Sequence, residues 1–290
     1  MLIYINGKLV EKKKAVISVF DHGLLYGDGV FEGIRVYDSL VFRLKEHIDR
    51  LYRSADAIEL KIPMTKTGMI ETVIKTLKIN NLKDAYIRLV VTRGVGDLGL
   101  DPRNCKKPTV FIITDKIALY PKKFYEKGLD IVTAATRRNL PNALNPKIKS
   151  LNYLNNILAK IDAIKSGAEE AIMLTHDEYV AECTGDNIFI VKGCELITPP
   201  VDIGALEGIT RDAVINLAKK MDIVFYEKML KMDDIYAADE VFLTGTAAEI
   251  IPVVRIDERK IGDGNPGSVT LKLLEGFKKL TKTDGVRYAL

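Results

Sequence analysis

The feature that most constrains the fold of this chain is an alternation of short strand-like segments with amphipathic helical segments. Residues 85–92 and 109–114 are rich in β-branched side chains, which favour buried strands. Residues 44–60 instead repeat apolar side chains with the period of a helix. Sheets and helices each bury an apolar face against another element, so the alternation predicts a mixed α/β or α+β fold.

The same criteria assign the other elements, and turn residues set their ends. In the first half we expect strands at 2–5, 33–37, 40–42, 85–92 and 109–114, and helices at 44–60 and 69–77. In the second half we expect strands at 129–134, 171–174, 178–181, 187–191, 195–198, 223–226 and 240–244, and helices at 150–166, 211–221 and 268–280. Asn6-Gly7 predicts a hairpin, and the basic run 12–14 is interpreted as a solvated hairpin turn.

The expected helix 150–166 begins at a residue that suits a helix N-terminus. Ser150 is a good N-cap residue. We expect one face of the helix to point to the core, formed by Leu151, Leu154, Leu158, Ile161 and Ala163.

A break in the alternation predicts two domains. Residues 115–128 hold a proline and match neither period, which is typical of a linker. We therefore expect a smaller N-terminal domain at 1–115, a linker at 116–128 and a C-terminal domain at 129–290. The crevice between two such domains is the default ligand site.

Composition excludes several function classes. The net charge of +4 and the pI near 8.7 are too mild to indicate nucleic-acid binding. Three cysteines and three dispersed histidines predict neither a disulfide framework nor a metal site. No signal peptide and no apolar run long enough to span a membrane is found in the sequence. We expect a cytoplasmic protein that binds neither nucleic acid nor membrane.

Two charged residues suggest chemistry on an aldehyde cofactor. Lys149 directly precedes the expected helix start at Ser150, where the positive helix end depresses a lysine pKa and favours Schiff-base formation. Lys147 competes for this role, and an ordinary exposed lysine is the simpler interpretation. Glu182 ends an expected strand, where a carboxylate can pair with a protonated pyridine nitrogen. By itself it is more often a turn carboxylate.

Two further segments suit anions. Gly208-Ile209-Thr210 opens a helix, whose free N–H groups and hydroxyl suit a phosphate. The small residues of LTGTAAEI (243–250) let backbone N–H groups approach a carboxylate. The alternatives are a plainly capped helix and a tight strand-to-helix turn. Together with an aldehyde-binding lysine and a ring-nitrogen carboxylate, these segments describe pyridoxal 5'-phosphate acting on an amino acid.

The stretch ECTGDNIF, followed by LIT and LEGITR, resembles the signature of the class IV aminotransferases, which are fold-type IV pyridoxal phosphate enzymes. The resemblance covers nearly the whole chain and is closest to branched-chain amino acid aminotransferases. It implies a two-domain fold like that of D-amino acid aminotransferase, with the cofactor in the interdomain crevice. It also implies a role in amino-acid biosynthesis.

The resemblance carries roles to individual residues. It selects Lys149 over Lys147 as the catalytic lysine, through the context IKSLNYLNN. It implies cofactor contacts by Lys149, Glu182, Arg50, Tyr153, Ile209, Thr210 and Thr246. It implies substrate contacts by Tyr26, Phe31, Gly33, Tyr86, Arg88, Thr246 and Ala247. Apolar walls with one arginine would accept both leucine and 2-oxoglutarate, in a ping-pong reaction.

Other functions remain open on the sequence. A D-amino acid aminotransferase or an aminodeoxychorismate lyase would share Lys149, Glu182 and Arg50. The D-amino acid enzymes carry an arginine-x-histidine pair that the run at 102–105 lacks. A non-catalytic small-molecule binding module is the alternative from another class. The family also implies a homo-oligomer, a dimer at least with a hexamer as the larger form, in which the loop 94–102 completes the partner's pocket.

Overall fold

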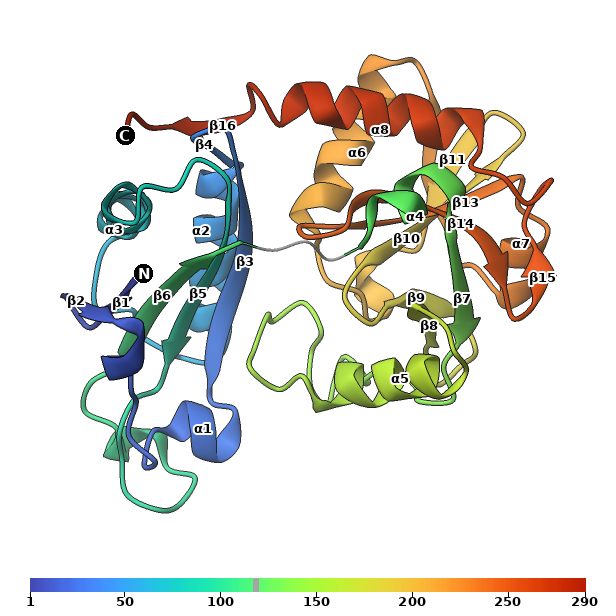
Figure 1. The fold of residues 1–290 in the computed structure, drawn as a ribbon. Helices are drawn as coiled ribbons and strands as arrows, with labels where there is room; N and C mark the ends of the chain where they lie inside the picture. The colour runs from blue at the N-terminus through green and yellow to red at the C-terminus, as the bar shows by residue number, and fades with distance from the viewer. Residues whose placement is uncertain (117–119) are drawn as a thin grey trace. The chain divides into compact units, whose positions relative to one another are not determined.

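The computed structural model describes residues 1–116 and 120–290, which form two compact units (Figure 1). Unit 1 comprises Met1–Ile117, Ile148–Asn152 and Thr281–Leu290, and unit 2 comprises Ala118–Lys147 and Tyr153–Leu280. The chain therefore passes between the units more than once.

Unit 1 is a seven-stranded antiparallel sheet with helices on one face. Its elements are β1 (Leu2–Ile5), β2 (Lys8–Glu11), η1 (Lys12–Lys14), α1 (His22–Tyr26), β3 (Gly29–Tyr37), β4 (Leu40–Phe42), α2 (Leu44–Ala57), α3 (Lys66–Ile79), β5 (Ala85–Thr92), η2 (Pro102–Asn104), β6 (Thr109–Asp115) and β16 (Gly285–Arg287). The strand order is β16-β4-β3-β5-β6-β1-β2. The long central pair β3–β5 aligns Gly33 with Arg88, and this register fixes which side chains share a face.

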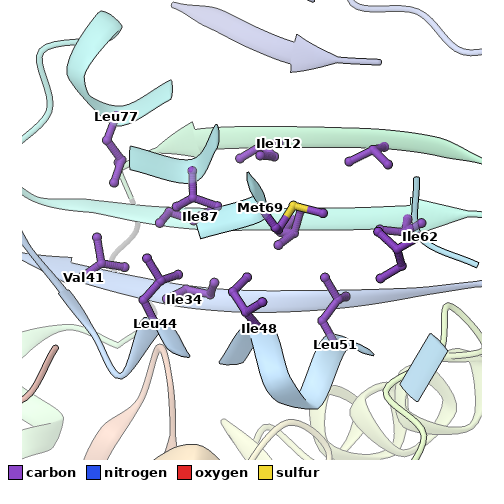
Figure 2. Close-up of a cluster of buried hydrophobic side chains, with 14 of the residues drawn as sticks. Ile34, Val41, Leu44, Ile48, Leu51, Ile62, Met69, Leu77, Ile87 and Ile112 are labelled. Carbon is purple, nitrogen blue, oxygen red and sulfur yellow. The ribbon is translucent and has the colours of Figure 1, made fainter. Parts of the chain in front are cut away.

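The core of unit 1 lies between this sheet and the two long helices. Figure 2 shows Leu44, Ile48 and Leu51 of α2 pointing at strand side chains such as Ile34 and Ile87. The α2 residues recur at helical spacing, so one stripe of the helix is apolar and buried. Because alternate strand residues point to opposite faces, the neighbours of Ile34 in β3 point away from the helices.

Unit 2 is built on a mixed nine-stranded sheet. Its elements are α4 (Lys122–Lys127), β7 (Leu129–Thr133), α5 (Leu154–Lys165), β8 (Glu170–Leu174), β9 (Val180–Cys183), β10 (Asn187–Lys192), β11 (Glu195–Thr198), η3 (Val201–Ile203), α6 (Ile209–Lys220), β12 (Val224–Glu227), α7 (Met232–Tyr236), β13 (Glu240–Gly245), β14 (Glu249–Ile256), β15 (Arg259–Lys260) and α8 (Ser268–Leu280). The order is β12-β11-β10-β13-β14-β7-β8-β9, with β15 beside β14. Both parallel and antiparallel pairs occur, and its central strands are buried on both faces.

The predicted mixed α/β fold is confirmed, and most elements lie within a few residues of their predicted bounds. Several predictions were wrong. The predicted helix 150–166 begins only at Leu154, with Tyr153 as its N-cap. Ser150 instead forms a β-bridge with Val30, because the backbone around it adds to the edge of β3. The basic run 12–14 is exposed as expected, but it forms a 3-10 turn after a strand rather than a hairpin turn.

Of the expected core face of α5, only Ala163 is buried, and Leu151 lies before the helix. Leu154, Leu158 and Ile161 are 66%, 44% and 39% exposed, whereas Asn156, Ala159 and Ala163 are buried. The helix is apolar on two sides, and the side with alanines packs more closely against β7 and β8.

A strand at 249–256 was missed, and LTGTAAEI is a turn between two strands rather than a turn into a helix. Pro252 weakened the strand pattern. It is tolerated because β7 pairs with β14 only from Val253 onward. The predicted domain boundaries stay a prediction, and part of the linker at 116–128 lies outside the described residues. Division of the chain at one linker does not account for the segments 148–152 and 281–290, which belong to unit 1.

Candidate active site

The segment that carries Lys149 is held as an extra strand beside the start of β3. The Phe31 N–H donates to the Lys149 carbonyl oxygen (3.0 Å), and the Leu151 N–H donates to the Gly29 carbonyl oxygen (2.9 Å). The Lys149 N–H donates in turn to the Ser54 hydroxyl of α2 (3.1 Å). Backbone pairing, and not a helix start, therefore positions this lysine. The argument that placed it at a helix N-terminus was wrong, since α5 begins five residues later.

The Lys149 side chain lies over an aromatic ring next to an arginine. Its Nζ is 4.7 Å from the centroid of Phe31, and the guanidinium carbon of Arg88 is 4.5 Å from the same centroid. The centroid of the Tyr86 ring lies 5.8 Å from the same guanidinium carbon. The β3–β5 register puts Phe31, Tyr86 and Arg88 on the sheet face that points away from α2. Unit 1 thus brings a primary amine, a guanidinium and two aromatic rings to one surface.

Gly33 leaves room for one of those rings. A Cβ atom at this position would lie 2.0 Å from the Tyr86 hydroxyl oxygen, which is far inside van der Waals contact. The Tyr86 side chain therefore lies over position 33 of β3, where any side chain larger than that of glycine would clash with it. Among the predicted substrate contacts, Phe31, Gly33, Tyr86 and Arg88 are brought together.

A buried charge cluster lies on the opposite face of β3. Arg50 donates from Nε and Nη2 to the two carboxylate oxygens of Glu32, both at 2.8 Å, and Nδ1 of His47 is 2.7 Å from the same carboxylate. Burial opposes ionisation of Glu32, but the charges and hydrogen bonds of Arg50 and His47 outweigh it and lower its pKa to about 2. Burial lowers the pKa of His47, and Arg50 and Lys149 add to that effect against the attraction of Glu32. Two of the three guanidinium nitrogens of Arg50 are thus held by Glu32, and its predicted contact with a phosphate stays a prediction.

In unit 2, Glu182 is a buried carboxylate with three protein partners. Arg138 lies 2.8 Å from its Oε1, and both side chains are less than a tenth exposed. Its Oε2 accepts hydrogen bonds from the Leu206 N–H (2.9 Å) and from the Asn187 amide (3.3 Å). The carboxylate is fixed in direction and matched in charge, which suits a group that must face a cationic ring nitrogen.

Arg138 is itself held by the start of α5. Its guanidinium donates to the Asn155 and Asn156 side-chain oxygens (3.0 and 3.2 Å) and to the Gly204 carbonyl oxygen (3.1 Å). These contacts explain why Asn156 lies on the buried side of a helix that leaves leucines exposed. Tyr153, a predicted cofactor contact, is the N-cap of the same helix and is half-buried.

The predicted anion-binding segments lie in unit 2. Helix α6 begins at Ile209, and its N-cap Gly208 offers no side-chain cap for the free N–H groups. Thr246 and Ala247 form the turn between β13 and β14. Near this turn, the buried hydroxyl of Thr244 finds no hydrogen-bond partner among the described residues. A buried orphan hydroxyl and an uncapped helix start are the groups that an anion satisfies.

The remaining predicted substrate residue, Tyr26, lies at the end of α1. Its hydroxyl oxygen accepts a hydrogen bond from the Gly99 N–H (2.9 Å), which ties α1 to the loop between β5 and β6. A second tie joins His22 Nε2 to the Asp97 carbonyl oxygen (2.9 Å). Tyr26 therefore braces the loop that was predicted to act on a partner subunit.

Sequence reasoning missed the partners of the assigned residues. Glu32 is a charged residue inside a buried strand, and His47 and Arg50 are one turn apart on the apolar stripe of α2. Charges at core positions of two adjacent elements are a readable signal for a buried ion pair. Arg138 gave no comparable signal, because it lies between elements in the region 134–147.

Comparison with known proteins shows the family of the chain. A model of the amino-transferase class IV family matches residues 29–256, and the chain belongs to that family. A Methanocaldococcus jannaschii protein, provisionally named a branched-chain-amino-acid aminotransferase, is 56% identical over 99% of both chains. The crystal structure of Escherichia coli branched-chain amino acid aminotransferase is 36% identical, covers 98% of this chain and 96% of its own, and has a TM-score of 0.95. The Thermobaculum terrenum enzyme of the same name, solved in its holo form with pyridoxal phosphate, is 30% identical over 97% and 93% of the two chains, with a TM-score of 0.88.

The groups in unit 2 fit a phosphorylated pyridine. Glu182, held by Arg138, supplies the carboxylate for a ring nitrogen. The uncapped start of α6 and the unsatisfied Thr244 hydroxyl supply donors for a phosphate. No group of three His, Cys, Asp or Glu residues in the described ranges is arranged to hold a metal ion.

Proposed function

We propose that this chain is a pyridoxal 5'-phosphate-dependent transaminase that moves the amino group of L-leucine, L-isoleucine or L-valine to 2-oxoglutarate. The observation that carries the proposal is the placement of Lys149 and Arg88 over the ring of Phe31. A transaminase that uses both a branched-chain amino acid and 2-oxoglutarate requires a reactive amine, an apolar wall and a group that binds a carboxylate. The names of the related proteins support the choice of branched-chain donors.

The bound cofactor supplies an aldehyde for the amino group and an electron sink for the electrons released at the substrate α-carbon. The Lys149 amine would hold that aldehyde and would move the proton at the substrate α-carbon. Glu182 holds the proton on the pyridine nitrogen, while Arg138 keeps the carboxylate oriented. Ile209, Thr210, Thr246 and Arg50 would bind the phosphate, and Tyr153 would contact the ring hydroxyl.

Substrate selection follows from the open face of the β3–β5 sheet. Phe31 and Tyr86 pack against a branched aliphatic side chain, and Gly33 leaves the space in which Tyr86 lies. Tyr26 completes this wall. Arg88 receives the second carboxylate when 2-oxoglutarate replaces the amino acid, because a guanidinium binds carboxylates in two-point geometry. Thr246 and Ala247 bind the α-carboxylate.

The first experiment maps the covalent link. Reduction of the holoenzyme with borohydride, followed by peptide mapping, should place the modification on Lys149. Lys149→Ala should abolish turnover. Lys147→Ala is the matched control, because its side chain pairs with Asp202 at an exposed position and should be dispensable. Modification of Lys147 would overturn the assignment.

A second experiment separates the alternatives within the family. The enzyme is mixed singly with L-leucine, L-alanine, D-alanine and L-glutamate, and conversion of the cofactor to its amine form is followed spectroscopically. The proposal expects rapid conversion with L-leucine and L-glutamate. Conversion by D-alanine alone would favour a D-amino acid aminotransferase. A colourless protein that pyridoxal 5'-phosphate cannot reconstitute would favour a binding module.

We further propose that the enzyme acts in the cytoplasm as a homo-oligomer. In the described part of the chain, no helix is both long and apolar enough to cross a membrane. Support for self-association comes from the exposed leucines of the β5–β6 loop, Leu98 and Leu100.

A further inference from the structure

Unit 1 contains a large cavity that takes no part in the proposed reaction. Its volume is about 890 Å³, within the usual range of small-molecule sites. Its walls come from the β1–β2 turn, the segment 59–64 after α2, and residues 102–110 that lead into β6. The residues proposed to hold cofactor or substrate are not among those that line it.

The walls of the cavity are apolar with a basic rim. Leu60 and Val110 are buried in the unit 1 core, and Met64 packs against that core. Lys106 and Lys107 stand beside these apolar groups. A surface of this kind binds a molecule that has both an apolar body and a negative charge.

The charge balance of the lining favours an anion. Arg93 pairs with Asp28 through two hydrogen bonds (2.9 and 3.0 Å), so it contributes little net charge. Lys61 adds a third exposed ammonium to the rim, and of the described lining residues only Glu59 opposes these lysines with a carboxylate. The lysine ammonium groups are solvated point charges that attract carboxylate, sulfonate or phosphate groups.

We propose that this cavity is a second binding site, for an organic anion with an apolar body. Its occupant would contact the base of the β5–β6 loop. Arg93 ties that base to the cavity wall by donating to the Ile58 and Glu59 carbonyl oxygens (2.6 and 2.8 Å). Binding should therefore slow hydrogen exchange in the 94–104 loop. The proposal is independent of the proposed function, because its test measures neither cofactor binding nor turnover.

The test uses anilinonaphthalene sulfonate as the probe and the holoenzyme as the target. Fluorescence titration gives the dissociation constant, and the methyl NMR signal of Met64 reports the location. Lys106→Glu with Lys107→Glu should weaken binding about tenfold or more, since two attractive charges become repulsive. Lys12→Glu with Lys13→Glu is the matched control: it makes the same charge change in the same unit, at exposed positions outside the cavity.

The expected result is weakening in the cavity variant alone, with a probe-induced shift of Met64 and none of the buried Met173 in unit 2. Equal weakening in both variants, or no weakening in either, would overturn the proposal. The neutral analogue phenylnaphthylamine and plain sulfate should each bind much more weakly. If phenylnaphthylamine binds as tightly as the sulfonate probe, the site does not require a charge. If sulfate binds as tightly, the site does not require an apolar body. Unchanged exchange of the 94–104 amides would refute the contact with the loop.

Discussion

At the scale of single residues, the carboxylate assigned to the cofactor depends on one arginine. Arg138 and Glu182 form a buried pair at 2.8 Å. Arg138→Leu should lower the free energy of unfolding by about 3–5 kcal/mol, because it leaves Glu182 as an uncompensated buried charge. Urea denaturation at neutral pH measures the loss. Adding Glu182→Gln should recover part of it, since a neutral amide needs no counter-charge.

The adjacent arginine provides the control for this prediction. Arg137 pairs with Glu178, and both side chains are more than a third exposed. Arg137→Leu should therefore cost no more than about 1 kcal/mol, as exposed ion pairs generally do. Equal losses in the two single variants would contradict a special role for the buried pair. Strict additivity of Arg138→Leu and Glu182→Gln would contradict their coupling.

The Glu32 cluster predicts how unit 1 responds to acid. Burial raises the pKa of Glu32, but Arg50 and His47 reverse this and bring it to about 2, against 4.5 for an ordinary glutamate. Between these pH values the unfolded chain binds a proton that the folded chain does not. The stabilisation that Glu32 contributes is therefore complete above pH 4.5 and falls as the pH drops toward 2, by about 3 kcal/mol.

His47 acts in the same direction at higher pH. Its folded pKa lies below 6.5, so the unfolded chain takes up a proton first as the pH falls from that value. Unfolding free energies measured across the acid range should show both steps. Glu32→Gln should lower stability at neutral pH, by removing the buried negative charge beside Arg50, and should flatten the dependence below pH 4.5. A dependence that survives Glu32→Gln unchanged would assign it to other groups.

At the scale of elements, the β3–β5 pair depends on a missing side chain. A Cβ at position 33 would meet the Tyr86 hydroxyl at 2.0 Å. The hydroxyl is the far end of its side chain, so Gly33→Ala should shift the ring rather than the strand, at about 1–3 kcal/mol. Denaturation measures this cost, and the KM for leucine should rise because the shifted ring narrows the proposed pocket.

The background variant Tyr86→Ala isolates the clash. Without the ring, alanine at position 33 should be neutral or slightly stabilising, since it has less backbone freedom to lose than glycine in a strand. If Gly33→Ala is as costly without the tyrosine as with it, the close approach is not the reason for the glycine.

Elements were predictable from sequence where one periodicity dominated. Helix α2 has a single apolar stripe, and its existence and core face followed directly from it. Helix α5 has apolar residues on two sides, and only tertiary packing selects the side with Ala159 and Ala163. Its start could not be read from Ser150, because pairing with β3 competes with helix formation there. Ser150 is a good capping residue, but in the folded chain it pairs with the edge of β3 instead of starting a helix.

At the scale of the whole molecule, the sequence indicated the family and its cofactor, but not how the fold positions the candidate residues. The segments around Lys149, Glu182 and Ile209 resemble motifs of the family to which the chain belongs. The sequence did not reveal that Lys149 is held by β3 or that Arg138 faces Glu182. Such contacts join residues far apart in the chain, and no local period encodes them.

The last prediction concerns self-association through the β5–β6 loop. Its ties to α1, through Tyr26 and His22, hold it in place, yet Leu98 and Leu100 are 71% and 81% exposed. Apolar groups on a braced loop suit a partner subunit. Leu98→Asp with Leu100→Asp should weaken the oligomer in sedimentation and raise the KM for leucine, while cofactor binding persists.

Matched exposed apolar positions in unit 2 distinguish a specific interface from general stickiness. Val224 and Leu271 are 50% and 44% exposed, and Val224→Asp with Leu271→Asp introduces the same two charges. This control should sediment like the wild type and keep its KM. If the two pairs of substitutions act alike, the loop has no special place in assembly. A wild-type chain that sediments as a monomer at assay concentration and is fully active would exclude a site shared between subunits, because no partner loop would then be present to complete it.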